Sequence, residues 1–224
     1  MLPLRDDVPS RSAPLVVETL VLLNLAAFLY ALTLDPGDTA TFFDRWGLVP
    51  REFLRGVAHP TATQQVAWLT PLSAMFLHGS LLHLAGNPLY LWVFGAPVED
   101  LLGHARFALF YLACGIVAAA AHLASAPGSY VPTLGASGAI SGLLGAYAIA
   151  YPTGRLRLLW PRVRVPAFLF LGLWIALQIF YGVRAAKAGA AEIAWWAHVG
   201  GFLAGATLAR SMWVRKPTRS RLRS

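Results

Sequence analysis

Charged residues are scarce in this sequence of 224 residues: Asp, Glu, Lys and Arg make up 12% of it, whereas 57% of the residues are hydrophobic. Ordinary soluble domains carry about 25% charged residues, so this composition excludes a typical water-soluble protein. Cysteine is equally rare. The single thiol, Cys114, excludes an intramolecular disulfide, and we expect it to pack as a small buried hydrophobic side chain.

Motifs that would define several other functions are also absent. No H-E-x-x-H pattern occurs, and no carboxylate accompanies the histidines in the outer halves of the predicted membrane helices, so we expect no metal and no cofactor. Asp6 and Asp7 precede the first apolar stretch, and no small-residue cleavage site follows it. We therefore expect no cleaved signal peptide.

Long apolar stretches are what the sequence contains instead. They predict an all-α polytopic membrane protein in which a single domain, residues 15–212, contains six transmembrane helices. The predicted helices span residues 15–34, 72–94, 107–124, 136–151, 166–183 and 193–212.

Local signals set the ends of these helices and the character of the connections. Gly95 and Pro97 are expected to end the second helix, and residues 99–106 to form a short polar turn after it. Residues 35–70 mix charged and aromatic side chains, which predicts an amphipathic segment in the lipid headgroup region. Residues 123–154 contain no charged side chain, yet their prolines and glycines prevent one continuous helix. We expect this connection to dip into the protein, so that the fourth helix begins inside the membrane.

The formal net charge of +8 raises the question of a nucleic-acid partner. The positions of the basic residues argue against one. With six spans, 13 of the 18 Lys and Arg residues lie on the side of the termini and 5 on the other, which predicts that both termini are cytoplasmic. Residues 1–14 are predicted to be a disordered cytoplasmic N-terminus, and residues 213–224 a basic cytoplasmic tail in contact with membrane lipids. The Ala- and Arg-rich composition favours a bacterial plasma (inner) membrane.

A serine flanked by small residues, Ser137, stands at the start of the fourth predicted helix. One interpretation is close helix packing, because glycines recur at four-residue intervals both here and in the sixth helix. The other is that Ser137 is a nucleophile whose small neighbours leave room for a substrate backbone. On this segment alone both interpretations stay open. The glycines concerned are Gly135, Gly138, Gly142, Gly201 and Gly205.

Three further polar side chains are expected at the depth of Ser137. His198 lies in the outer half of the sixth helix, and His83 and Asn87 share one face of the second because they are four residues apart. These residue types support acyl transfer, in which Ser137 attacks and His198 takes its proton. His83, Asn87 and the backbone N–H of Ser137 would form the oxyanion hole.

The fourth and sixth predicted helices contain no acidic residue that could orient the imidazole. We therefore expect a Ser-His dyad in which packing, rather than an acid, fixes the ring. Because hydrolysis needs water, which is absent from hydrocarbon, we expect the site to open to the outer aqueous side.

These residues resemble the rhomboid family of intramembrane serine proteases. The resemblance implies that Ser137 is the nucleophile, His198 the base, and His83 and Asn87 part of the oxyanion hole. It also implies that the substrates are transmembrane proteins, that residues 35–70 form a membrane-inserted loop, and that the fifth helix is a lateral gate. The similar segments are Phe76-Leu77-His78-Gly79, His83-Leu84-Ala85-Gly86-Asn87, Leu91-Trp92-Val93-Phe94-Gly95, Val98-Glu99-Asp100, Gly135-Ala136-Ser137-Gly138 and Ala197-His198-Val199-Gly200-Gly201.

Two positions depart from the pattern of some family members. Ser141 stands where those members carry an aromatic residue that stacks on the imidazole, and Trp68-Leu69-Thr70-Pro71 lacks their arginine. Both departures concern how the site is supported.

Two alternatives remain beside proteolysis. A non-catalytic rhomboid-like protein that binds membrane clients would typically lack the serine or the histidine, and this chain has both. A transporter or channel would show internal repeats and a polar path across the bilayer, and no inverted repeat is apparent. The sequence assigns no oligomeric state.

Overall fold

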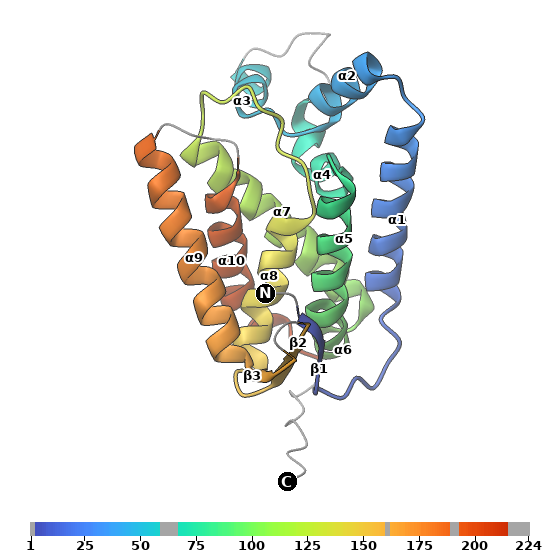
Figure 1. Ribbon diagram of the computed structural model, residues 1–224, viewed down its shortest axis with the longest axis vertical. Helices are drawn as coiled ribbons and strands as arrows, with labels where there is room; N and C mark the ends of the chain where they lie inside the picture. The colour runs from blue at the N-terminus through green and yellow to red at the C-terminus, as the bar shows by residue number, and fades with distance from the viewer. Residues whose placement is uncertain (1–2, 59–66, 160–161, 189–192, 215–224) are drawn as a thin grey trace.

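The computed structural model describes residues 3–58, 67–159, 162–188 and 193–214. They form an upright bundle of helices with a small sheet at one end (Figure 1). The helices of the first half are α1 (Leu15–Leu32), α2 (Pro36–Trp46), α3 (Pro50–Ala58), η2 (Ala67–Leu69), α4 (Thr70–Ser73), η3 (Ala74–Phe76), α5 (Leu81–Tyr90), η4 (Leu91–Gly95) and α6 (Ala96–Leu102). The helices of the second half are α7 (His104–Ser125), α8 (Ser137–Ala150), α9 (Ala167–Ala188) and α10 (Trp195–Met212), and the strands are β1 (Pro3–Asp6), β2 (Arg155–Leu158) and β3 (Arg164–Pro166).

Three helices among the described residues, α1, α7 and α9, are long and apolar enough to cross a membrane. Helix α8 is also apolar but shorter, with 14 residues. Large apolar side chains such as Leu22, Leu109 and Phe168 lie exposed on the outer faces of the long helices, where lipid would cover them. The count of six spans and the side of the termini stay predictions.

The second predicted helix differs most from its expected form. It begins at Leu81, after an extended segment, and Ser80 caps it by accepting a hydrogen bond from the backbone N–H of His83. Gly95 and Pro97 do not end it, so that prediction is wrong. Leu91–Gly95 form a π-helical turn, and Pro97 lies in the first turn of α6, where a missing N–H is tolerated. The helix ends at Gly103, whose φ of 75° favours glycine.

The predicted polar turn over residues 99–106 is also wrong, because its carboxylates lie buried within α6. Glu99 accepts hydrogen bonds from the backbone N–H groups of Val16 and Val17, each at 2.9 Å, and so caps the start of α1. Asp100 accepts from the N–H of Arg11 and the hydroxyl of Ser12. These acidic residues fasten the chain before α1 to the bundle.

The N-terminal stretch is ordered over residues 3–6, which corrects the prediction of disorder there. Strand β1 pairs antiparallel with β2, and β2 with β3, in the order β1-β2-β3. Asp6 accepts a hydrogen bond of 2.8 Å from the Tyr147 hydroxyl of α8. The predicted basic tail lies outside the described residues from position 215 on. At Val214, whose N–H bonds to the carbonyl of Leu101, the chain is at the same end of the bundle as β1 (Figure 1).

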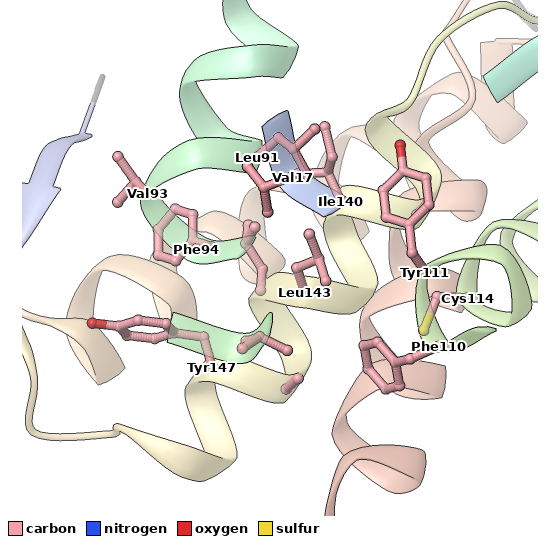
Figure 2. Packing of buried hydrophobic residues seen from close by; sticks show 14 of the residues in the cluster. Val17, Leu91, Val93, Phe94, Phe110, Tyr111, Cys114, Ile140, Leu143 and Tyr147 are labelled. Atoms are coloured by element: carbon pink, nitrogen blue, oxygen red, sulfur yellow. The ribbon is translucent and has the colours of Figure 1, made fainter. Parts of the chain in front are cut away.

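Helix α8 runs through the centre of the bundle, and its side chains are buried on all sides (Figure 2). Its largely apolar sequence suits this position, because residues 139–147 are all buried. The ring of Tyr147 packs edge to face against that of Phe94 in η4, with 5.2 Å between the centroids. On another side of α8, Cys114 of α7 is buried against Gly142, as predicted for this thiol.

The glycines of α8 and α10 meet at backbone distance. A Cβ added at Gly201 would overlap the carbonyl oxygen of Gly138, and one at Gly205 would overlap that of Gly142. Such contact lets two helices approach more closely than larger residues allow. The α8–α10 pair is the most extensive helix contact in the described structure. It brings the start of α8 against the start of α10.

Candidate active site

A tightly held connection places Ser137 at the first position of α8. The N–H of Gly135 donates to the carbonyl of Ala74 at 2.8 Å, and Thr133 exchanges two backbone hydrogen bonds with Leu48. The Thr133 hydroxyl also lies 2.7 Å from Nε2 of His122 in α7. Gly135 has a φ of 119°, a backbone conformation that favours glycine. This packing on neighbouring elements agrees with the connection predicted to dip into the protein.

Ser137 and His198 meet across the α8–α10 contact. The Ser137 Oγ lies 2.9 Å from Nε2 of His198, within hydrogen-bond distance. Two residues 61 positions apart in the sequence are thus brought together by the packing of the glycines described above. Both side chains are partly buried.

The second ring nitrogen of His198 also has a partner, which no sequence motif indicates. Nδ1 lies 2.7 Å from the side-chain oxygen Oε1 of Gln178, a buried residue of α9. Since an amide oxygen only accepts, Nδ1 carries the proton and Nε2 is left to accept from Ser137. The imidazole is therefore held by a hydrogen bond to an amide as well as by the packing that the sequence predicts. A polar amide in an otherwise apolar helix was the available signal, because such residues are costly in a membrane.

Aromatic rings approach the imidazole from α9 and α10. The ring centroid of Trp174 lies 6.1 Å from that of His198, with the planes at 42°, and Trp195 lies at 6.4 Å with the planes near perpendicular at 88°. Ser141 takes another role: its hydroxyl donates to the carbonyl of Ser137 at 2.6 Å. The ring is thus flanked by indoles, although α8 supplies no stacking aromatic residue.

His83 and Asn87 of α5 converge on Gly135, two residues before Ser137. A Cβ added at Gly135 would lie 2.7 Å from Nε2 of His83 and 3.6 Å from Nδ2 of Asn87. The Asn87 Nδ2 is buried and has no hydrogen-bond partner within the part of the chain that the structure describes. A buried donor without an acceptor is costly, so the position of this amide beside Gly135 needs an explanation.

A cavity of about 470 Å³ is lined by Ser137, His198, His83 and Gly135. Its remaining wall consists mostly of small or apolar residues of α7, α8 and the preceding connection, among them Gly115 and Ala118. Among the described residues, no group of three or more His, Cys, Asp or Glu side chains could hold a metal ion.

A helical membrane bundle with a hydrogen-bonded Ser-His pair beside an internal cavity is the class of protein that fold and site define. The comparison with known protein families shows to which family the chain belongs. A sequence model described as the Rhomboid domain matches residues 65–215, well over half of the chain, and the protein therefore belongs to the rhomboid family. It is an integral membrane protein.

Curated relatives of this family include bacterial and mitochondrial proteins. The chain is 36% identical over 126 residues to the rhomboid protease GluP of Bacillus subtilis, which covers 55% of this chain and 24% of GluP. It is 37% identical over 101 residues to the human presenilin-associated rhomboid-like protein, mitochondrial, covering 44% of this chain and 26% of the relative. The putative rhomboid protease YdcA of Bacillus subtilis is 38% identical over 80 residues, which cover 36% of this chain and 40% of YdcA. The matched part of this chain thus covers less than half the length of each of these relatives.

Proposed function

We propose that this protein is an intramembrane serine endopeptidase that cleaves transmembrane proteins within or next to their membrane-spanning segments. The observation that carries the proposal is the distance of 2.9 Å between Nε2 of His198 and the Oγ of Ser137 inside the bundle. Membership of a family that includes named rhomboid proteases supports it.

In the proposed reaction, Ser137 Oγ attacks the carbonyl carbon of the substrate while its proton passes to Nε2 of His198. The carbon–nitrogen bond then breaks, and the imidazolium returns the proton to the leaving amine. Water attacks the resulting ester and gives a proton to Nε2, which passes it back to the serine as the acid leaves. No other residue needs to gain or lose a proton.

The negative charge on the tetrahedral oxygen would be stabilised by three donors. They are the Asn87 amide, a ring N–H of His83 and the backbone N–H of Ser137, the first residue of α8. The first N–H groups of a helix have no intrahelical acceptor, and the helix dipole favours negative charge there. The Asn87 amide, buried without a partner among the described residues, is preorganised for this oxygen.

The substrates we propose are transmembrane helices. A peptide bond inside a helix is shielded by its own hydrogen bonds and side chains, so it must be extended locally before it reaches Ser137. Small or helix-weakening residues near the cleaved bond lower the cost of that change. We propose that the substrate enters beside α9, whose outer face is largely exposed.

The proposed topology has six spans, with both termini in the cytoplasm of a bacterial cell and the site open to the outer side. Helices α8 and α10 and the α5–α6 stretch would complete the six, beside α1, α7 and α9. The strand β1 and the end of α10 lie together at one end of the bundle, and Ser137 begins α8 toward the opposite end (Figure 1).

The test is labelling of the purified protein in detergent with an active-site-directed fluorophosphonate. We expect the wild type and Ser141→Ala to react, and Ser137→Ala and His198→Ala to lose the label. Ser141→Ala is the matched control, because its hydroxyl lies one turn away and bonds to the Ser137 carbonyl. A folded wild type that does not react would contradict the proposal and favour a protein that binds membrane clients without cleaving them.

A further inference from the structure

The imidazole of His198 is held from two helices. Its Nε2 faces Ser137 of α8, and its Nδ1 faces the amide oxygen of Gln178, on α9, at 2.7 Å. A neutral imidazole carries one proton on one of its two nitrogens, and only the form with the proton on Nδ1 can accept from the serine. A hydrogen-bond acceptor at Nδ1 therefore determines whether Nε2 is unprotonated and able to accept the proton of Ser137.

Helices that pack around the ring offer no carboxylate for this task. No Asp or Glu occurs in α5, α8, α9 or α10. The Gln178 side chain is 8% exposed, so water competes weakly with its bond to the ring. If the imidazole moved away, the amide oxygen would be left without a partner in an apolar surrounding. The cost of such an unpaired buried oxygen favours the hydrogen bond between the two groups.

We propose that Gln178 is the positioning residue of the base: by accepting from Nδ1–H it holds His198 in the form whose Nε2 can take the proton of Ser137. The residue touches neither substrate nor reacting atoms and acts through the imidazole. This role rests on the proposed function, because a prepared Nε2 matters only where Ser137 attacks.

The position of Gln178 on α9 links the state of the base to that helix. Trp174, which flanks the imidazole, lies four residues before Gln178 and so on the same face of α9. Elsewhere α9 exposes much of its surface, and its contacts are with α10, α8 and the sheet. The ring therefore depends for its orientation on the helix beside which we propose that the substrate enters.

Two substitutions at Gln178 distinguish the effect of the accepting oxygen from the effect of side-chain length. Gln178→Met keeps the length but removes the oxygen, and Gln178→Glu keeps an oxygen that accepts. Leu177→Ala, at an exposed neighbouring position of α9, is the control for disturbance of the helix. Gln178→Leu is a second variant without an acceptor, and thermal unfolding in detergent shows that each variant is folded.

The first readout is the ¹⁵N spectrum of protein labelled in its six histidines, recorded where the imidazoles are neutral, with His198→Ala to assign the signals. We expect His198 in the wild type, in Gln178→Glu and in Leu177→Ala to carry its proton on Nδ1. In Gln178→Met and Gln178→Leu, we expect the form with the proton on Nε2 to appear. A spectrum unchanged by Gln178→Met and Gln178→Leu would overturn the proposal.

The second readout is cleavage of a reconstituted transmembrane substrate. We expect kcat of Gln178→Met to fall about tenfold with KM within about twofold, since the base is misoriented rather than lost, and loss of a general base costs roughly 10²- to 10⁴-fold. Gln178→Glu is expected to retain more of kcat than Gln178→Met. An equal loss in both would overturn the role of the acceptor. If the proton leaves Nδ1 in Gln178→Met and Gln178→Leu while the wild type neither cleaves the substrate nor reacts with the fluorophosphonate, the proposed function is refuted. Gln178 would then still determine which nitrogen of His198 carries the proton, but not as part of a catalytic site.

Discussion

Gly135 combines two constraints, a φ of 119° and the ring of His83 against its α-carbon. We predict that Gly135→Ala lowers the rate of fluorophosphonate labelling at least tenfold, because the new methyl group would displace His83 or Ser137. Loss of a preorganised donor alone costs roughly 10²- to 10³-fold in kcat. The control is Gly128→Ala in the same connection, where a Cβ meets no atom within 4 Å. Equal labelling of the two variants would show that the conformation of Gly135 does not matter for the site.

Asn87 differs from most buried amides because its Nδ2 has no partner among the described residues. We predict that Asn87→Ala lowers kcat for a transmembrane substrate by roughly 10²- to 10³-fold with little change in KM, as expected for a donor that acts in the transition state. Any loss of thermal stability should reflect only the smaller side chain, since the amide nitrogen has no hydrogen-bond partner among the described residues.

The matched control for Asn87 is Asn24 of α1, whose amide is also buried and unpaired within the described part of the chain. Asn24→Leu should leave kcat unchanged and keep or raise the thermal stability, because it removes an unsatisfied polar group. A loss of activity in Asn24→Leu as large as that in Asn87→Ala would argue for a general effect on the fold.

Sequence patterns identified the polar residues that the structure brings together, since Ser137, His198, His83 and Asn87 are rare hydroxyl, imidazole and amide groups on apolar helices. Gln178 was missed because no motif surrounds it, and its importance comes from the packing of α9 on α10. Their roles in catalysis stay predictions until the variants above are measured.

The α8–α10 contact shows how a helix pair can support both packing and a site. Glycine carbonyls of α8 lie directly against glycines of α10, so the distance between Ser137 and His198 depends on the absence of side chains there. The packing and catalytic interpretations of these small residues are therefore compatible.

We predict that Gly205→Val lowers the free energy of unfolding by about 1–3 kcal/mol or more, because its side chain would collide with the backbone of Gly142. Labelling of Ser137 should slow as α10 moves away from α8. Unfolding by a denaturing detergent measures the first effect. The control is Gly172→Ala on α9, where a Cβ meets nothing within 4 Å. If both variants unfold alike, close approach of the two backbones does not stabilise the bundle.

Helix positions followed from apolar stretches, but helix ends did not. Proline and glycine usually stop a helix, yet at Gly95 and Pro97 a π-helical turn lets the chain continue. The burial of Glu99 could not be predicted locally either, since its partners, the first N–H groups of α1, lie more than 80 positions away. Such long-range contacts carry no local sequence signal.

For the molecule as a whole, the ends of the described chain gather at one end of the bundle and the proposed site lies toward the other (Figure 1). The sheet order β1-β2-β3 ties the N-terminal stretch to the connection between α8 and α9. Asp6 joins this sheet to α8 through the Tyr147 hydroxyl. The strand is therefore part of the folded protein, although its composition predicted disorder.

Asp6 makes this attachment sensitive to pH. Burial, opposed in part by the Tyr147 hydrogen bond, raises the pKa of the Asp6 carboxyl from its ordinary 3.8 to about 6. The folded protein thus holds this proton more tightly than the unfolded chain does. The contribution to stability is complete below pH 3.8 and is lost as the pH rises through about 6. We predict that the melting temperature in detergent falls between pH 4 and pH 7, and that Asp6→Asn flattens this slope and melts higher at pH 7. Asp38→Asn, on the exposed surface of α2, should keep the wild-type slope. A wild-type slope retained in Asp6→Asn would assign the pH dependence to another group.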